Sequence, residues 1–590
     1  MYEYNTHHST CYRDFIHSPL GVRWGALSHH ALPLHQHHHL SLHLSLPPTQ
    51  LSPKELKPLS HPSKHRSQAV LLAQKALTDY FHSTRSLPFL YAEHIGRNSF
   101  YSLYDPISKV EFSLSSFAKS FERFLRYHPI NEFEFFFESI GITQKEISGF
   151  LPPNKFFFAE DGRILNAAGA LSGFGFPWNK LGILYKAEAS IFDKDSDDLS
   201  RRLCRFKDYG LSNVSVIGIC LAFPFVLGGK GDLGVEAGAL FDDLKTVFVN
   251  FDLGSFVEEN VDAWYEICRK IRLFYDLGCE KGKIGELMGR SRNIFLEYSE
   301  EVLVRKMDFF CRLNVRKADI GLLLLECPEI LSFDLEAPVI SVMGFLKHFG
   351  LGLQKSKSVA RMYPYVLGRN KMANLPHVMR ALDLHEWFFG MMRNGNHRLL
   401  GNYVLSHPDE DLDEDYRDGL EKIQSSRTPA HTINKLNFLH GIGYGENLLT
   451  MKVLEHVHGT SSELQQRFNC LLHAGLEFSK LCTMISFSAK ILNQKPEILE
   501  RKVDFLIQEM GLSLQYLDVF PAYLCFNLDN RIKPRYRCHV WLAENGLCTK
   551  NYSLASMIAT SEKSFIARLY GIHPAVPKLW LECFSPQKDQ

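Results

Sequence analysis

The chain is 590 residues long, more than a single hydrophobic core usually accommodates, so several domains or an extended array of repeats are expected. Hydrophobic residues make up 45% of the sequence and charged residues 22%, which excludes a wholly disordered protein. The 66 lysines and arginines almost balance the 65 aspartates and glutamates. This near-neutral charge excludes a uniformly basic polyanion-binding protein, so any such function depends on where the cations are placed.

Membrane-spanning and zinc-ribbon proteins are also excluded. No run of about 18 apolar residues occurs, and the best candidate, residues 214–227, is interrupted by Gly218 and Pro224. The 13 cysteines include no Cys-x-x-Cys pair, the spacing that structural zinc sites and redox dithiols use. We therefore expect no membrane partner and no metal.

Residues 1–65 are rich in His, Ser, Leu and Pro and contain only three acids, Glu3, Asp14 and Glu55. An acid-poor, low-complexity N-terminus is typical of an organellar transit peptide, and we predict a disordered transit segment here. The histidine-rich run at 35–39 is an alternative metal site, but a segment broken by prolines lacks the second shell that orients metal ligands. Residues 66–130 are interpreted as an N-terminal linker region.

A repeat of two helices and a turn is predicted to begin near residue 131. In its clearest copy, the first helix has an apolar stripe of helical period at Ile320, Leu323, Leu324 and Cys327. The tetrapeptide Pro-Glu-Ile-Leu at 328–331 then predicts a tight turn. A second helix is predicted from the apolar residues Val339, Met343 and Leu346, and it ends at Gly350, a left-handed cap.

The same pattern recurs along the chain. The Pro-x-x-Leu turn returns at 224–227, 364–367 and 521–524, and alanine replaces its proline at 189–192 and 489–492. From Ala489 to Gly511 the interval is 22 residues, the same as from Pro328 to Gly350. The second-helix stripe also returns, at Val503, Leu506, Ile507 and Met510. Units of about 30 to 40 residues with two short helices cannot bury their apolar faces alone, so they must stack. The irregular stretch 228–262 and the acidic stretch 409–415 are interpreted as insertions or solvated loops.

The closing part of the chain carries the most specific pattern. Residues 528–535 read Leu-Asp-Asn-Arg-Ile-Lys-Pro-Arg, which fits a signature L-x-x-R-I-x-P-R, and residues 560–565 are similar to a terminal S-E-x-x-F pattern. Together with the Pro-x-x-Leu turns and the Phe-Leu-x-x-x-Gly-like helix ends at 345–350 and 505–511, these motifs resemble the mitochondrial transcription termination factor (mTERF) family, in its plant organellar branch. The resemblance departs from the family pattern at the acidic stretch 409–415.

The resemblance implies an all-α fold, a right-handed, curved superhelical solenoid of mTERF repeats, each with two α-helices and a short 3-10 turn. The array is expected to span residues 131–572, with a C-terminal tail at 573–590. The resemblance also implies a nucleic-acid-binding protein that regulates mitochondrial gene expression through transcription termination, with the chloroplast as the alternative location. A splicing or ribosome-assembly factor on RNA is an alternative function, and a protein scaffold that binds no nucleic acid is another.

Positive charge is concentrated in two segments. From Arg531 to the C-terminus nine Lys or Arg stand against four acids, a balance of +5, and from Lys355 to Arg398 eight stand against two, a balance of +6. Pro534 is expected at the first position of a helix, which sets the neighbouring cations against the helix dipole, where a bound phosphate relieves their repulsion. A solvated helix face is the alternative for both segments. The predicted nucleic-acid-binding residues, as phosphate contacts that do not read bases, are Arg531, Lys533, Arg535, Arg537, Lys563, Arg568, Lys355, Lys357, Arg361, Arg369 and Lys371.

No enzyme motif is complete. The glycine-rich segment 228–231 lacks the first glycine of a phosphate-binding loop and the Ser or Thr that follows its lysine. The alternating aspartates at 411–415 resemble a calcium loop, but Tyr416 stands where that loop requires glycine. The His-Glu pair at 385–386 lacks a second histidine at zinc-protease spacing. We therefore expect a monomeric, non-enzymatic protein that binds double-stranded DNA or RNA and uses no cofactor and no small-molecule substrate.

Overall fold

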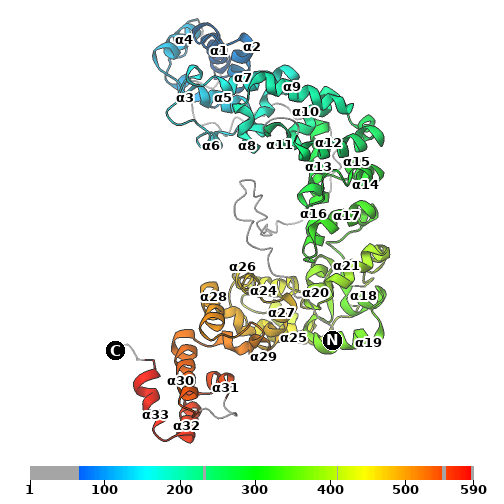
Figure 1. Cartoon of the computed structure of the whole chain (residues 1–590), viewed down its shortest axis with the longest axis vertical. Coiled ribbons are helices and arrows are strands. Elements are labelled where there is room, and N and C mark those ends of the chain that lie inside the picture. Colours follow the sequence, from blue (N-terminus) through cyan, green and yellow to red (C-terminus); the bar gives the residue numbers. More distant parts are fainter. Residues whose placement is uncertain (1–65, 114, 230–233, 408–409, 548–552, 587–590) are drawn as a thin grey trace. The chain divides into compact units, whose positions relative to one another are not determined.

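The computed structural model describes residues 66–113, 115–229, 234–407, 410–547 and 553–586. The predicted transit segment and part of the glycine-rich segment 228–231 lie outside these residues. The chain divides into two compact units, one ending at Arg269 and the other beginning at Lys270. Within each unit the helices follow one another in chain order (Figure 1). None of the described helices is both long and apolar enough to cross a bilayer.

The first unit is helical from its first described residue. Its helices are α1 (Arg66–Asp79), α2 (Phe89–Asn98), α3 (Tyr104–Ser108), α4 (Phe117–Tyr127), α5 (Glu132–Ser139), α6 (Gln144–Ile147), α7 (Arg163–Phe174), α8 (Leu181–Ala187), α9 (Ser196–Phe206), α10 (Asn213–Ala222), α11 (Phe225–Gly228), α12 (Val235–Lys245) and the first part of α13 (Val261–Asp276).

Packed helices occupy the region that was expected to be a linker. Helix α1 packs against α2 and α4, and α2 packs against α5. The contact face of α1 consists of Ala69, Ala73, Ala76 and Leu77, all buried. This stripe has helical period, but its alanines give a weak hydrophobic signal in the sequence while allowing helix backbones to approach closely.

The second unit is also almost entirely helical, and the predicted all-α class is confirmed. Its helices are α14 (Gly285–Arg290), α15 (Asn293–Glu297), α16 (Glu300–Cys311), α17 (Lys317–Glu326), α18 (Val342–His348), α19 (Leu353–Met362), α20 (Leu375–Ala381), α21 (His385–Arg393), α22 (Leu399–Asn402), α23 (Glu414–Gln424), α24 (Pro429–Gly441), α25 (Leu448–His456), α26 (Ser461–His473), α27 (Phe478–Phe487), α28 (Pro496–Asp504), α29 (Tyr516–Val519), α30 (Lys533–Glu544), α31 (Leu554–Ala559), α32 (Glu562–Ile572) and α33 (Val576–Leu579). A short antiparallel pair, β1 (Val339–Ser341) and β2 (Arg369–Lys371), joins residue 339 to residue 371. The expected tail contains α33, and Trp580 beyond it is 2% exposed within the core of the C-terminal helices.

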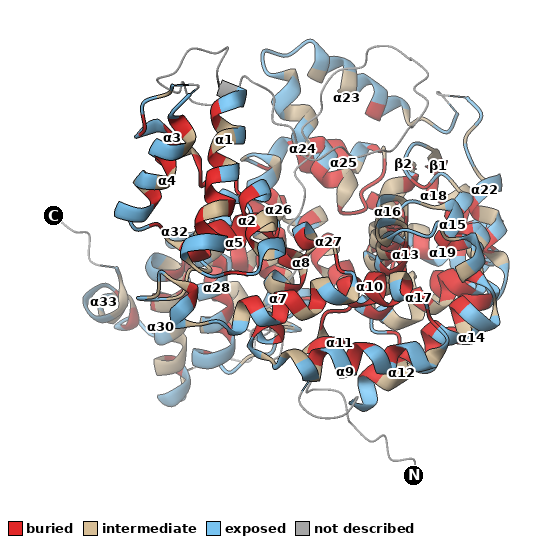
Figure 2. Cartoon of the chain, turned by 90° about the horizontal axis from the view of Figure 1, so that it is seen from above, coloured by how far each residue is buried: buried red, intermediate tan, exposed pale blue. Residues whose placement is uncertain are grey.

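The predicted repeat unit is present. Helix α17 buries Ile320, Leu323 and Leu324 completely, and the Pro-Glu-Ile-Leu segment forms the 3-10 turn Pro328–Ser332. Gly350 has φ +91°, the left-handed conformation expected of a helix cap. Buried residues lie along the contact sides of the helices, with exposed residues on the opposite sides (Figure 2).

Two details of the second helix differ from the prediction. Val339 belongs to β1, because the backbone of 339–341 pairs with β2 before α18 begins. Ile507 is 43% exposed although Leu506 is buried, because residues Phe505–Glu509 form a π-helical turn. The wider turn rotates the following side chains out of the 3.6-residue register on which the predicted stripe depends.

Among the described residues, each of seven helices carries a cation that donates a hydrogen bond to a carbonyl in the turn region of the following repeat. In α28, Lys502 is completely buried, and its Nζ donates a hydrogen bond to the carbonyl of Leu524 at 2.7 Å. The spacing between donor and acceptor is 22 to 27 residues, in the pairs Arg202 with Val226, Lys270 with Phe295, Lys306 with Phe333, Lys435 with Val457, Arg467 with Leu492, Lys502 with Leu524 and Arg535 with Met557. Carbonyls at the end of a helical turn lack internal partners and attract cations.

The pKa of Lys502 leads to a prediction about stability. Burial lowers this pKa to about 8, whereas a lysine in the unfolded chain has a pKa of about 10.4. Between these two pKa values the unfolded state binds the proton and the native state has released it. Burial of the charged lysine therefore lowers the free energy of unfolding most below pH 8, and this destabilisation decreases as the pH rises. Urea denaturation is expected to show wild type gaining stability relative to Lys502→Met between pH 8 and pH 10. A variant of the exposed Lys490, Lys490→Met, is expected to show no such change relative to wild type.

The repeats remain in contact across residues 385–424. The Asn447 amide donates to the carbonyls of Tyr365 at 2.9 Å and Leu367 at 2.5 Å. The guanidinium of Arg369 binds Glu446, with 2.7 Å between Nε and Oε2. These contacts connect residues on both sides of segment 385–424, so the array continues across this segment, which we call the insertion.

The acidic stretch of this insertion is partly helical. Asp413 caps the N-terminus of α23 by accepting a hydrogen bond from the Tyr416 amide at 2.9 Å. Tyr416 is buried, and its hydroxyl lies 2.8 Å from Nε2 of His440 on α24. Burial raises the pKa of the Tyr416 hydroxyl, so it stays protonated at neutral pH. Asp413 thus stabilises the start of α23, and the buried Tyr416 docks the helix on the repeat array.

Candidate nucleic-acid interface

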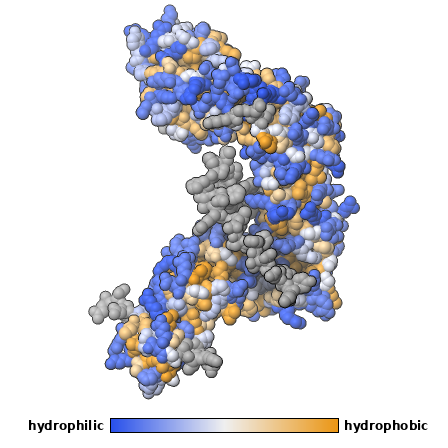
Figure 3. Space-filling model, in the orientation of Figure 1, coloured by the Kyte–Doolittle hydropathy of each residue, from blue (hydrophilic) through white to orange (hydrophobic). Residues whose placement is uncertain are grey.

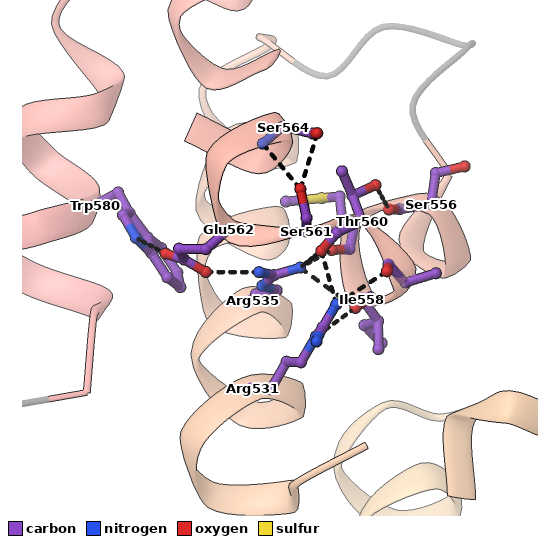
Figure 4. Close-up of polar contacts among 11 residues, drawn as sticks. Arg531, Arg535, Ser556, Ile558, Thr560, Ser561, Glu562, Ser564 and Trp580 are labelled. Carbon is purple, nitrogen blue, oxygen red and sulfur yellow. Dashed lines mark hydrogen bonds and ion pairs between the residues drawn. The ribbon is translucent and has the colours of Figure 1, made fainter. Parts of the chain in front are cut away.

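The two C-terminal sequence motifs pack against each other (Figure 4). The first motif forms the π-helical turn Leu528–Ile532 and the start of α30, and the second begins directly after α31 and forms the first turn of α32. Helix α31 ends at Ala559, where its last carbonyls have no partners within the helix. Arg531 and Arg535 point toward these carbonyls, so the two motifs form one structural unit.

Arg535 is the central residue of this unit and is 2% exposed. Its guanidinium donates hydrogen bonds to Met557 O at 2.7 Å, Ile558 O at 3.3 Å, Thr560 O at 2.6 Å and Glu562 Oε2 at 2.6 Å. The other oxygen of Glu562 accepts a hydrogen bond from Nε1 of Trp580 at 3.1 Å. The ring of Phe565 lies 4.4 Å from the guanidinium carbon. Arg535 therefore ties together α30, α31, α32 and the turn that follows α33.

Arg531 makes a parallel set of contacts. It donates hydrogen bonds to Ile558 O at 2.8 Å, Ala559 O at 2.9 Å and Thr560 O at 2.7 Å, and it covers the ring of Phe526. Burial lowers the pKa of Arg531 from its very high ordinary value, and the guanidinium remains charged at neutral pH.

These contacts change the interpretation of Arg531 and Arg535, which were predicted to bind phosphate. Pro534 is the second residue of α30, and the π-helical turn Leu528–Ile532 runs directly into this helix, so the helical segment begins earlier than predicted. The two cations complement the dipole at the end of α31. Their hydrogen-bonding groups are directed into the protein. The sequence signal that was missed is Glu562 of the second motif, which pairs with Arg535; of the carbonyl acceptors, only that of Thr560 belongs to this motif.

The other C-terminal cations are placed differently. Lys533 lies 2.7 Å from Asp529, and this hydrogen bond is the main cause of the lowered pKa of that carboxyl group. Arg537, Lys563 and Arg568 are exposed. The side chains of Arg537 and Lys563 form no hydrogen bond or ion pair with another described residue, so they remain open to a ligand.

Helix α19 carries the other predicted cluster. Lys355, Lys357 and Arg361 are exposed, and the ten residues of the helix include no acid. The helix is held by its opposite side, where Ser356 and Val359 are buried. Lys357 and Arg361 stand four residues apart and share the outward face. Within the described part of the chain, these three cations have no hydrogen-bonding or ionic partner.

The two remaining predicted residues lie in β2. Arg369 is paired with Glu446, and its side chain is 13% exposed, so its role in the structure is to join the strand to the segment after α24. Lys371 is exposed at the end of the strand. The structure thus separates the predicted set into structural arginines (Arg369, Arg531 and Arg535), one ion-paired lysine (Lys533) and exposed cations.

Metal-binding geometry is absent from the described ranges 66–113, 115–229, 234–407, 410–547 and 553–586, in which no group of three His, Cys, Asp or Glu side chains is placed to hold an ion. Asp413, one of the alternating aspartates, is a helix cap.

Comparison with known proteins agrees with the repeat architecture. The mTERF family model matches residues 260–384 and 425–566, and the gap between the two matches coincides with the insertion. The chain is 57% identical over 529 residues to Transcription termination factor MTEF18, mitochondrial, of Arabidopsis thaliana, a likeness that covers 90% of this chain and 95% of that protein. It is 28% identical over 270 residues to Transcription termination factor MTERF8, chloroplastic, of the same plant, covering 45% of this chain and 48% of that protein.

Stacked pairs of helices with short turns, linked by cation-to-carbonyl bonds, define an α-helical repeat protein. The chain belongs to the mTERF family. The predictions of family, of a helical-repeat fold and of a mitochondrial location are thereby confirmed, the last by the mitochondrial relative with 57% identity. The family consists of nucleic-acid-binding regulators of organellar gene expression that are not known as enzymes.

Proposed function

We propose that this protein binds mitochondrial double-stranded DNA as a monomer and regulates transcription by termination, with the outer face of α19 as its main phosphate-binding surface. The observation that carries the proposal is the arrangement of Lys355, Lys357 and Arg361, three exposed cations without an acid on the same helix. The relative MTEF18 bears the name of a transcription termination factor, which supports the same function.

Physical chemistry explains why these cations suit a phosphate backbone. Holding three like charges on ten residues without compensating acids costs electrostatic energy in the free protein. A duplex that meets this face releases condensed counterions, which drives binding irrespective of sequence. We include Lys371, Arg537, Lys563 and Arg568 as secondary contacts, since all four are exposed. The proposed mode positions the protein on the backbone and does not read bases.

The decisive experiment reverses the charge of the α19 cluster. The triple variant Lys355→Glu, Lys357→Glu, Arg361→Glu is expected to bind a DNA duplex about 100-fold more weakly at low salt, and the slope of log affinity against log salt is expected to fall by about 2 to 3. Fluorescence anisotropy over a salt series measures both quantities.

A matched control reverses three exposed cations in and just after the insertion, Arg417, Lys422 and Arg427. This second triple variant changes net charge equally and is expected to leave most of the affinity in place. Equal losses in the two variants would show that only net charge matters and would contradict an α19 interface.

The same measurement with structured RNA separates termination from the RNA-directed alternative. Tighter binding of RNA than of duplex DNA at equal salt favours a splicing or ribosome-assembly function. Absence of measurable binding of either nucleic acid by the wild-type protein favours a protein scaffold, and full affinity in the α19 triple variant contradicts the α19 interface. Sedimentation of the free protein tests the proposed monomer. We also infer that the protein acts by binding and not by catalysis, in keeping with the regulatory character of the family.

A further inference from the structure

A groove of about 560 Å³ lies between residues 510–519 and helices α30 and α31. Apolar side chains gather in patches on the surface of these C-terminal elements (Figure 3). One wall of the groove consists of Met510, Leu512, Tyr516 and Val519, and the other consists of Tyr536, His539, Val540, Ala543 and Glu544 of α30. Ser553, Leu554 and Ala555, at the start of α31, also line the groove. The groove is distinct from α19 and from the bonded arginines 531 and 535.

Helix α30 presents two apolar stripes. One stripe, with Cys538 and Leu542, is buried in the C-terminal core beside Phe565 and Trp580. The other runs along Tyr536, Val540 and Ala543, at the i, i+4, i+7 spacing of a single helix face, and it lines the groove. A second apolar stripe along the same short helix has the form that receives another helix in a groove.

Val519 is an exposed apolar residue of the groove and has an equivalent in the preceding repeat that lies outside the groove. Val519 lines the groove and is 84% exposed, at the end of α29 two residues before the turn that starts at Pro521. In the preceding repeat, the equivalent residue is Phe487, two residues before Ala489, and it is 79% exposed but does not line the groove. The two positions are therefore alike in exposure and in place within the repeat and differ in contact with the groove.

Charge restricts the kind of occupant. Glu544 is the one acidic residue that lines the groove, and it is exposed. His539 is the one basic residue in the lining. Glu509 is exposed beside the groove residue Met510. Among the described residues, Glu509 and Glu544 have no ion-pair partner, and no Lys or Arg lines the groove. Arg537 is exposed elsewhere on α30. The groove thus repels a phosphate backbone and favours a cation.

We propose that this groove binds an amphipathic helix of a partner protein, with the apolar face of the helix on the stripe of α30 and a Lys or Arg of the helix against Glu544. The span from Tyr536 to Glu544 covers eight helical steps, or about 12 Å, which corresponds to about two turns of a partner helix. The interface joins the protein to another polypeptide at a site separate from the proposed nucleic-acid surface.

A synthetic probe tests the groove in the full-length protein. The probe is a fluorescein-labelled 14-residue peptide of leucine and lysine in helical period, and anisotropy measures its binding. Saturable binding is expected, and Val519→Asp is expected to weaken it at least about tenfold because a desolvated apolar contact is lost. Phe487→Asp, the repeat-equivalent control, is expected to bind the probe as wild type does. Equal weakening by both variants, or no saturable binding to wild type, would overturn the proposal.

A charge exchange tests the predicted orientation of charges. Glu544→Lys is expected to weaken binding of the leucine-lysine probe several-fold and to strengthen binding of a leucine-glutamate peptide of the same length. A leucine-glutamate peptide that prefers wild type contradicts the proposal. Dimerisation of the free protein that Val519→Asp abolishes would instead assign the groove to a second copy of this chain. Because Val519 lies outside the nucleic-acid surface, Val519→Asp is expected to bind DNA as wild type does, so this proposal and the proposed function fail independently.

Discussion

Replacing Arg535 by methionine is expected to destabilise the C-terminal helices by about 3 kcal/mol. The substitution removes a guanidinium that is 2% exposed and leaves the carbonyls of Met557 and Thr560 without their donor. It also releases Glu562, which is held between Arg535 and Trp580. Urea denaturation measures the loss, and hydrogen exchange is expected to show faster opening of residues 553–586 than of α24 to α28.

The matched control for this prediction stands two residues away on the same helix. Arg537→Met removes an exposed guanidinium with the same change in charge and side-chain length, and it is expected to change stability by less than about 0.5 kcal/mol. Arg535→Lys is expected to give an intermediate loss, because an ammonium group cannot reach all the acceptors that the planar guanidinium bonds. Equal stability of the Arg535→Met and Arg537→Met proteins would contradict the structural role of Arg535.

Gly445→Ala is expected to destabilise the second unit strongly. A Cβ at this position would overlap the carbonyl oxygen of Leu367 and lie 2.6 Å from that of Val366, both rigid backbone atoms. The segments 365–371 and 444–447 would have to separate, at the expense of the Arg369–Glu446 pair. We expect a loss of about 3 kcal/mol in the free energy of unfolding, measured by denaturation.

Gly441→Ala is the control for that prediction. Gly441 ends α24, four residues before Gly445, and a Cβ there would meet no atom within 4 Å. Alanine at this place is expected to leave stability unchanged or to raise it slightly, since it favours helix and restricts the unfolded chain. Comparable losses in the two variants would show that the close backbone approach at Gly445 is not what holds the array together across the insertion.

The sequence predicts the repeat correctly where the periodic spacing of hydrophobic residues determines which side of a helix is buried. Ile320, Leu323 and Leu324 follow the helical period and are all buried, and Pro328 marks a 3-10 turn as its chemistry requires. The sequence predicts a linker at residues 66–130, where α1 packs through its alanines, because small apolar residues contribute little to a hydrophobic pattern. The pairing of Val339 with Lys371 depends on a contact 32 residues away in the chain, which local pattern does not contain.

The candidate site was predictable in part for a related reason. Composition alone indicates that α19 has cations and no acids, and the structure leaves those cations exposed. Arg531 and Arg535 have the same local appearance in the sequence, but their partners are backbone carbonyls of Met557 to Thr560. A carbonyl belongs to every residue type and leaves no mark in the sequence, so a cation that is bonded internally cannot be told from a free one by composition.

The cation-to-carbonyl bonds between repeats restrict the positions at which the chain can be cut into fragments that still fold. A fragment that ends shortly after α28 would retain Lys502 in its buried position and lose the Leu524 carbonyl that receives it. Autonomous fragments should therefore end after a complete donor and acceptor pair, 22 to 27 residues beyond the last such cation. Boundaries for recombinant pieces, and the positions at which limited proteolysis leaves a folded product, are set by this overlap and not by the ends of individual helices.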